Sequence, residues 1–199
     1  MKTLYTIISF FVLSIAACKS EADKETVPKD HITITLGGGC YWCVEAVFQQ
    51  LDGVASVTSG FMGGHIPDPT YKQVCEGTTG HIEVINVVYN PKTISTKTIL
   101  KWFWKAHDPT NPLGQGADIG ERYTSNIFYH TDEQKADAEW SKKTAQEAFA
   151  KPIVTKIRKV GVFYKAQEDH QNYYARMKNK NPYCRAVITP KLEKLNLEK

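Results

Sequence analysis

Two hydrophobic periods alternate along this chain in an order that few folds accommodate. Apolar residues recur at every second position in four segments and at helical spacing in two segments between them. The strand-like segments are 32–36, 54–61, 82–89 and one near 126–130, and the helical segments are 44–51 and 95–107. The order strand, helix, strand, strand, helix, strand is the split unit of ferredoxin-like folds. It predicts an α+β fold with a two-layer ferredoxin-like βαββαβ core.

The rest of the chain has weaker patterns. A third helix is expected after the capping-box pair Thr131 and Gln134, followed by a last strand over 153–164. From Ala166 the chain is polar and has no clear hydrophobic period until about residue 186. We therefore expect an irregular C-terminal tail.

Length and charge exclude several classes of protein. A chain of 199 residues is long enough for one domain with a hydrophobic core. Its 25 Lys and Arg against 21 Asp and Glu give a net charge of +4, spread along the chain without a basic run, so we expect no nucleic-acid partner. We also expect a monomer. The long loops 62–81 and 108–121 exceed about 12 to 15 residues, a length that usually has a functional reason.

The N-terminus is expected to be a targeting segment. The apolar stretch 4–15 is shorter than the roughly 20 residues that a membrane-spanning helix needs, so it predicts a signal peptide. It ends in Ala16-Ala17-Cys18, which resembles the lipobox of bacterial lipoproteins. The expected organisation is a signal peptide over 1–17, a flexible charged tether over 18–30 and one domain over 31–199. Cys18 would carry the lipid on the periplasmic side of a bacterial membrane. An ordinary signal peptide cut near Ala17 is the alternative, and it also means export.

Cys40 follows three glycines at the start of a predicted helix. Unpaired backbone N–H groups and the helix dipole stabilise a thiolate at such a place, so a nucleophile is expected there. A buried, inert cysteine is the alternative. The nearby Cys43, three residues on, favours chemistry over packing.

Residues 37–54 read GGGCYWCVEAVFQQLDGV, which closely resembles the signature of the A-type peptide methionine sulfoxide reductases. Further segments follow in that family's order: 60–64, 69–71 with 74–75, 79–84, 107–110, 115–120 and 170–173. The resemblance covers residues 32 to about 190. Several motifs in one order are far more specific than a single CxxC pair.

The resemblance implies how a methionine sulfoxide would be reduced. The S epimer of the sulfoxide is the implied substrate, either protein-bound or free. Cys40 matches the nucleophile, and Glu83 matches the acid that protonates the oxygen, a role that burial favours by raising its pKa. The remaining matches are Tyr71 and Tyr123, which bond the oxygen, Tyr41 and Trp42, which hold the S-methyl group, and Asp118, which organises the site.

The chain departs from the family pattern at several positions. Ala117, Arg122, Thr124 and Asp169 stand where Asn, Gln, Arg and Tyr are usual, and Tyr41 and Phe61 exchange the usual Phe and Tyr. None of these changes removes a reacting group. They predict altered efficiency or substrate preference.

Attack on the sulfoxide leaves Cys40 as a sulfenic acid, which condenses with a second thiol. The resemblance implies Cys184 as this resolving cysteine, in a tail expected to be flexible, and Cys43 is the alternative because it lies one helical turn away. Cys75 is not required by the resemblance. We expect no bound cofactor, and electrons from a thioredoxin-like dithiol reductant.

Two other functions use the same residues. A thioredoxin-like thiol-disulfide oxidoreductase would use the Cys40 and Cys43 pair directly. A zinc site could combine these thiols with one of His65, His81, His107 or His170, but no second CxxC and no HxxxH spacing supports it. We therefore expect no metal.

Overall fold

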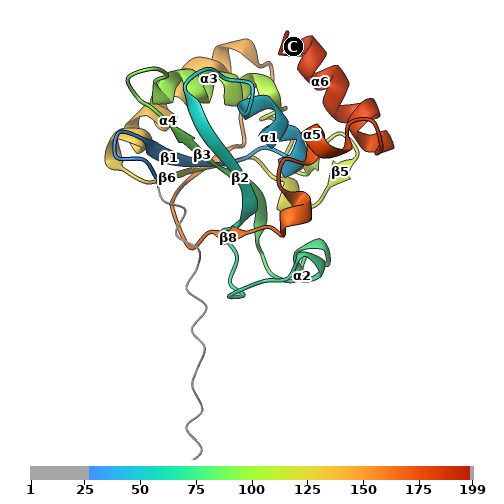
Figure 1. The fold of residues 1–199 in the computed structure, drawn as a ribbon. Coiled ribbons are helices and arrows are strands. Elements are labelled where there is room, and N and C mark those ends of the chain that lie inside the picture. The colour runs from blue at the N-terminus through green and yellow to red at the C-terminus, as the bar shows by residue number, and fades with distance from the viewer. Residues whose placement is uncertain (1–26, 198–199) are drawn as a thin grey trace, which may run out of the picture.

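The computed structural model describes residues 27–197. The predicted signal peptide, the lipid-attachment residue Cys18 and most of the predicted tether lie outside these residues. Six strands form one mixed sheet: β1 (Ile32–Gly37), β2 (Val54–Met62), β3 (Ile82–Tyr89), β6 (Asn126–Tyr129), β7 (Lys156–Lys159) and β8 (Tyr164–Lys165) (Figure 1). A separate pair of short strands, β4 (Gly114–Gln115) and β5 (Asp118–Ile119), lies in the second long loop.

The sheet confirms the predicted core. Its strand order is β7-β6-β1-β3-β2-β8, and the four middle strands, β6-β1-β3-β2, have the ferredoxin-like order with every neighbour antiparallel. The helices between these strands are α1 (Tyr41–Phe48) and α3 (Thr96–Ala106), as the hydrophobic periods predict. A short helix that the sequence pattern did not indicate, α2 (Tyr71–Cys75), lies in the first long loop, where Thr70 and Gln73 form its capping box.

Two hydrophobic clusters pack on the sheet. The larger one joins β3 residues Ile85, Val87 and Tyr89 to α1 and α3, and the smaller one contains Ile82 and Val84. Side chains alternate across a strand, so odd-numbered residues of β3 face the helices. Glu83 therefore belongs to the helix-facing row, and the strand carries its carboxyl group to the start of α1.

The predicted strand over 153–164 is wrong as a single element. Its residues form β7 and β8, which pair at opposite edges of the sheet: β7 lies parallel to β6, and β8 lies antiparallel to β2. The predicted helix after Thr131 is α4 (Asp132–Ala145), with the Thr131 hydroxyl accepting from the Gln134 N–H at 3.2 Å.

The C-terminal tail is not irregular. It contains α5 (Tyr173–Met177), a π-helical turn (Cys184–Ile188) and α6 (Thr189–Lys194). Cys184, Ile188 and Leu192 recur at every fourth position and are buried in the main hydrophobic cluster, which is why this polar segment folds onto the domain. Within residues 27–197, none of the helices is long and apolar enough to cross a membrane.

Candidate active site

Cys40 is the N-cap residue of α1 and is buried. The chain reaches it through Gly38 and Gly39, which turn from the end of β1 into the helix. Gly39 has a φ of +97°, and a Cβ there would lie 2.6 Å from the Gln115 side chain. The sequence places glycine here because this turn and this close approach exclude a side chain.

Glu83 lies beside the first turn of α1, with only 2% of its surface exposed. The Tyr41 N–H, one of the unpaired amides at the helix start, donates to Glu83 Oε2 at 3.1 Å. Burial raises the pKa of Glu83 to about 8, although the hydrogen bond from Tyr41 and the nearby Arg122 both oppose the rise. The expected rise in pKa is thus present, and the carboxyl group holds a proton at neutral pH.

Arg122, which departs from the family pattern, lies close to the Glu83 carboxyl group. Its Nε lies 3.9 Å from Glu83 Oε1, and its Nη1 donates to the Cys75 carbonyl at 2.7 Å. The guanidinium also lies over the Tyr123 ring, 4.4 Å from the ring centroid. The departure therefore puts a cation next to the acid and lowers the pKa that burial raises.

Tyr71 and Tyr123 approach the same carboxyl group from the two long loops. Tyr71 is the first residue of α2, and Tyr123 ends a 3-10 turn over Glu121–Tyr123. Burial, with the negative charge of Glu83 adding to it, raises the pKa of Tyr123 to about 12 and raises that of Tyr71 as well. Both hydroxyls therefore keep their protons and can donate hydrogen bonds.

The two predicted aromatic residues differ in exposure. Tyr41 is 1% exposed, and its hydroxyl is hydrogen-bonded to His170 Nδ1 at 2.7 Å. Trp42 is half-buried and stacks on Tyr173 with 3.7 Å between ring centroids and 5° between planes. Trp42 thus keeps part of its surface accessible, while Tyr41 is buried with its ring 6.1 Å from the Trp42 ring.

The Cys40 thiol has a different setting from the one that the sequence predicts. The first amide of the helix donates to Glu83 and not to this thiol. Hydrogen bonding with Cys43, together with burial, raises the pKa of Cys40 well above its usual range. The same interaction lowers the pKa of Cys43 to about 7. The two thiols therefore titrate as a pair, so the fall in the pKa of one is linked to the rise in the pKa of the other.

Tyr183 joins the cysteine pair to Asp118. Its hydroxyl donates to Asp118 Oδ2 at 2.6 Å and shares a hydrogen bond with Cys43 Sγ at 3.4 Å. Asp118 is thus linked to the cysteine pair through Tyr183.

The predicted flexible setting of Cys184 is wrong. It is 0% exposed in the π-helical turn, and burial raises the pKa of its thiol, with the charge of Cys43 adding to the rise. Cys75 lies half-buried at the end of α2. The four cysteines at positions 40, 43, 75 and 184 are free thiols.

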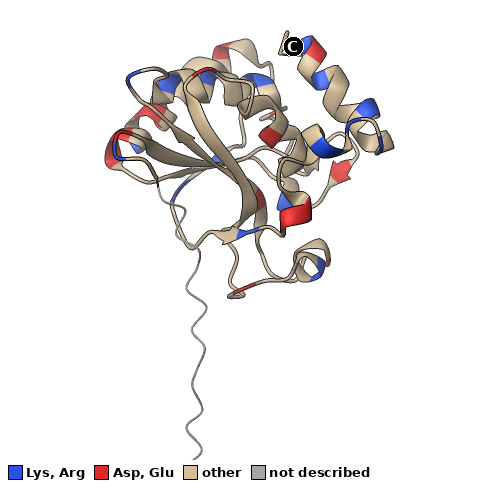
Figure 2. Cartoon of the chain, in the orientation of Figure 1, with Lys and Arg blue, Asp and Glu red and all other residues tan. Residues whose placement is uncertain are grey.

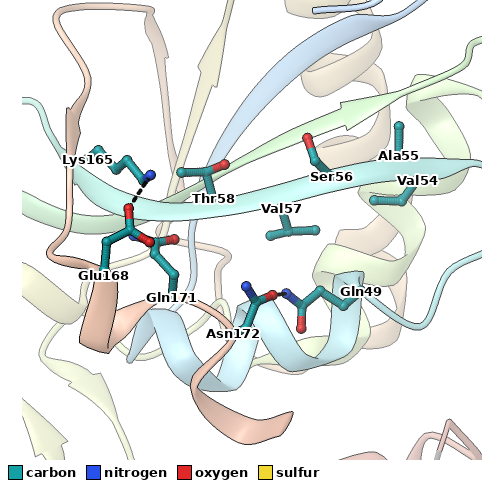
Figure 3. A pocket seen from close by; sticks show the side chains of 10 residues that line it. All are labelled: Gln49, Val54, Ala55, Ser56, Val57, Thr58, Lys165, Glu168, Gln171 and Asn172. Atoms are coloured by element: carbon teal, nitrogen blue, oxygen red, sulfur yellow. Dashed lines mark hydrogen bonds and ion pairs between the residues drawn. The ribbon is translucent and has the colours of Figure 1, made fainter. Parts of the chain in front are cut away.

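Cys40 and Cys43 line a cavity of about 580 Å³ between α3, the second long loop and α6. A different cavity, of about 480 Å³, lies along β2, where Gln49 and Asn172 face each other in a hydrogen bond of 2.7 Å (Figure 3). The two thiols line the first of these cavities and not the second.

The cysteines and histidines that were considered as zinc ligands are spread over the fold. Within the described part of the chain, no group of three or more His, Cys, Asp or Glu is placed to hold a metal ion. The ring nitrogens of His107 are hydrogen-bonded to the Phe103 carbonyl and the Ser125 hydroxyl, and those of His81 to Ile66 and Gly64.

Sequence reasoning assigned no role to several residues of the site. His170 and Tyr173 stand in a motif that the resemblance includes, and the structure places them against Tyr41 and Trp42. For Tyr183, the only indication of a role in the sequence is its position directly before Cys184.

Comparisons with known proteins agree with this geometry. The family model described as peptide methionine sulfoxide reductase matches residues 32–199. The peptide methionine sulfoxide reductase MsrA of Natronomonas pharaonis is 48% identical over 166 residues, which are 81% of this chain and 91% of that protein. Mxr1 from Saccharomyces cerevisiae in reduced form is similar with a TM-score of 0.74 and 32% identity, over 77% of this chain and 90% of that one. The complex of Mxr1 with Trx2 gives a TM-score of 0.56 and 25% identity, over 76% and 91% of the two chains.

Proposed function

The chain belongs to the peptide methionine sulfoxide reductase family and reduces methionine sulfoxide with a thiol, and we propose that Cys40 is its nucleophile and Glu83 its proton donor. One observation carries this assignment. Glu83 holds a proton next to the first turn of the helix that Cys40 caps. A sulfoxide oxygen leaves only if it is protonated. A carboxyl group with an ordinary pKa would be ionised at pH 7 and could not supply that proton.

The step balances with these two groups. Cys40 Sγ bonds to the sulfoxide sulfur while Glu83 gives its proton to the oxygen, and the thiol proton of Cys40 replaces the one that Glu83 gave. The hydroxyl group then leaves the substrate sulfur with its bonding pair and bonds to Cys40 Sγ, and the bond between the two sulfurs breaks with its electron pair going to the methionine sulfur. The products are methionine and Cys40 sulfenic acid, so the sulfoxide sulfur gains two electrons and the cysteine sulfur loses two.

The surrounding residues bind the substrate in this proposal. Tyr71 and Tyr123 donate hydrogen bonds to the oxygen, because both hydroxyls keep their protons. Trp42 contacts the S-methyl group, and Asp118 holds Tyr183 beside the cysteine pair. The S epimer is the proposed substrate, protein-bound or free.

A turnover assay with the two separated epimers tests the function. Reduction of the S-sulfoxide, with the R-sulfoxide left unchanged, is the expected result. Free methionine sulfoxide and an oxidised protein are supplied in parallel to show which form is preferred. Failure to reduce either epimer with excess dithiothreitol would contradict the proposal.

We propose Cys43, the alternative to Cys184, as the first resolving cysteine. The two sulfurs of Cys40 and Cys43 share a hydrogen bond, and Cys43 is the thiol with the lowered pKa. Its thiolate attacks the Cys40 sulfenic acid, the sulfur-sulfur bond forms and hydroxide leaves, which becomes water on taking up a proton. Cys184 lies in the same hydrophobic cluster, but burial raises its pKa, so it supplies less thiolate than Cys43 at neutral pH.

Peptide mapping after one turnover separates these two routes. Enzyme trapped with an alkylating agent should contain a Cys40–Cys43 disulfide. Cys43→Ser should accumulate sulfenic acid, whereas Cys184→Ser should form the same disulfide as the wild type. A Cys40–Cys184 disulfide as the first product would contradict this proposal and assign the resolving role to Cys184.

The electrons that reopen the disulfide come, in this proposal, from a thioredoxin-like dithiol. The yeast relative has been solved in complex with Trx2, which supports a partner of this kind. A thiol-disulfide oxidoreductase activity is not favoured, because the family match spans the whole domain rather than the CxxC segment alone.

Export as a lipid-anchored monomer is proposed from the sequence. The support is the apolar stretch 4–15 and Cys18, which lie outside the described residues. Replacing Cys18 with Ala should give unprocessed protein without lipid. An unchanged mature mass by mass spectrometry would contradict the anchor, and size-exclusion chromatography with light scattering tests the monomer.

A further inference from the structure

The cavity beside the cysteine pair lies on the α6 side of α1. Its lining comes from the C-terminal end of α3, the loop that carries Asp108 and Asp118, and α6. Among residues 27–197, the proposed substrate groups Glu83, Tyr71 and Trp42 are not part of this lining. Figure 1 shows α6 beside the helices above the sheet, whereas α2, which carries Tyr71, lies below the sheet. The pair of thiols is thus open on a side that the sulfoxide groups do not occupy.

Three lysines surround this opening. Lys105 is exposed at the end of α3, and Lys191 and Lys194 are on α6, whose basic residues are visible in Figure 2. The carboxylates of Asp108 and Asp118 also line it, but Asp118 accepts the hydrogen bond from Tyr183. The ammonium group of Lys191 is near enough to lower the pKa of Cys43.

We propose that this cavity is the route by which a reducing thiolate reaches the Cys40–Cys43 disulfide, and that Lys191 stabilises the Cys43 thiolate as it leaves. The ligand class is an anionic thiol, either free or on a dithiol protein. The inference rests on the proposed function and on Cys43 as the resolving cysteine. In this proposal, sulfoxide reduction and disulfide reduction at Cys40 take place on two different sides of the start of α1.

The exchange step follows from the charges. The thiolate of the reductant attacks Cys40 Sγ, a new disulfide forms between them, and the Cys40–Cys43 bond breaks with its electron pair going to Cys43. The thiol of lower pKa is the better leaving group, which favours attack at Cys40 and release of Cys43. A second thiol of the reductant then displaces Cys40, so the reductant becomes a disulfide and the enzyme gains two electrons.

The test uses three monothiols that differ in charge. Full-length enzyme is oxidised to the Cys40–Cys43 disulfide with diamide, and its reduction by 2-mercaptoethanesulfonate, 2-mercaptoethanol and cysteamine is followed by alkylation and mass spectrometry. Rates are expressed per thiolate present. We expect the anionic thiol to react about tenfold faster than the cationic one at low salt, within the usual range of electrostatic steering, and the ratio to fall at high salt.

Lys191→Met should reduce this ratio several-fold, and Lys105→Met, on a different helix, provides a second variant if the first does not fold. Lys159→Met on the edge strand β7 is the matched control, and it should keep the wild-type ratio. A wild-type enzyme without charge preference, or a preference that both cavity variants retain, would overturn the proposal. Methionine release by the wild type is measured separately, so failure of the first half-reaction is recognised independently of these rates.

Discussion

The groups on the two sides of Cys40 have pKa values that are shifted in opposite directions. On one side Glu83 is buried beside Tyr71 and Tyr123, and burial raises its pKa to about 8. On the other side Cys43 interacts with the Cys40 thiol and lines the same cavity as Lys191, and its pKa is lowered to about 7. In the proposed mechanism, the first side keeps a proton to donate to the sulfoxide, and the second side loses a proton to form the resolving thiolate. One helix end provides both environments because a β-strand packs on one side of it and a lysine-bearing helix on the other.

Replacing Cys40 with Ser should have the largest effect. No other residue is placed to bond to the sulfoxide sulfur in the proposed site, so methionine release should fall below detection even with excess dithiothreitol. Quenched single-turnover measurement of methionine checks this. Cys75→Ser, at a thiol outside the proposed chemistry, is the matched control and should release one methionine per enzyme.

Glu83→Gln should have the next largest effect. The substitution keeps the size of the side chain and removes the acidic proton, so the rate of methionine release should fall by about two to four orders of magnitude. Glu76→Gln, at an exposed position at the end of α2, should keep the wild-type rate. A wild-type rate in Glu83→Gln would assign the proton to another group.

Trp42→Leu should have a smaller effect on the substrate side alone. Contacts between a ring and a sulfur-bearing group contribute about 0.3 to 1.5 kcal/mol, so kcat/KM for the sulfoxide should fall by about two- to tenfold. Reduction of the preformed disulfide by dithiothreitol should change less than this. Trp140→Leu on α4 is the control for loss of an indole, and an equal loss in both variants would argue against a contact with the substrate.

Arg122→Gln should have the smallest effect, and it tests the family departure. Arg122 lowers the pKa of Glu83, so its removal should move the alkaline limb of the pH profile for methionine release to higher pH. The rate at pH 7 should change little, because Glu83 already holds its proton there. A limb that moves to lower pH would mean that Arg122 acts on a different group.

The hydrophobic pattern predicted the core well where each element buries one regular face. The bounds of β3 follow from its alternation, and the same alternation puts Glu83 on the helix side. The tail was less predictable because its three buried positions, Cys184, Ile188 and Leu192, are separated by polar residues and include a cysteine that reads as a reactive group.

The site was predicted by residue type but not by proton placement. The resemblance selected Cys40, Glu83 and the tyrosines, and the structure brings them together. The resemblance gave no sign that the Tyr41 N–H would donate a hydrogen bond to Glu83 and not to the Cys40 thiol. This choice depends on where the end of β3 meets α1. The effect of Arg122 likewise depends on a contact across two loops.

The pH dependence of single-turnover methionine release tests the central claim most directly. The wild-type rate should be constant at neutral pH and should fall as the pH rises through about 8, because Glu83 loses the proton it donates. Glu83→Gln should be slow and lack this fall. A wild-type rate that instead rises through pH 8 would show that loss of the Cys40 proton limits the reaction, and it would contradict Glu83 as the proton donor.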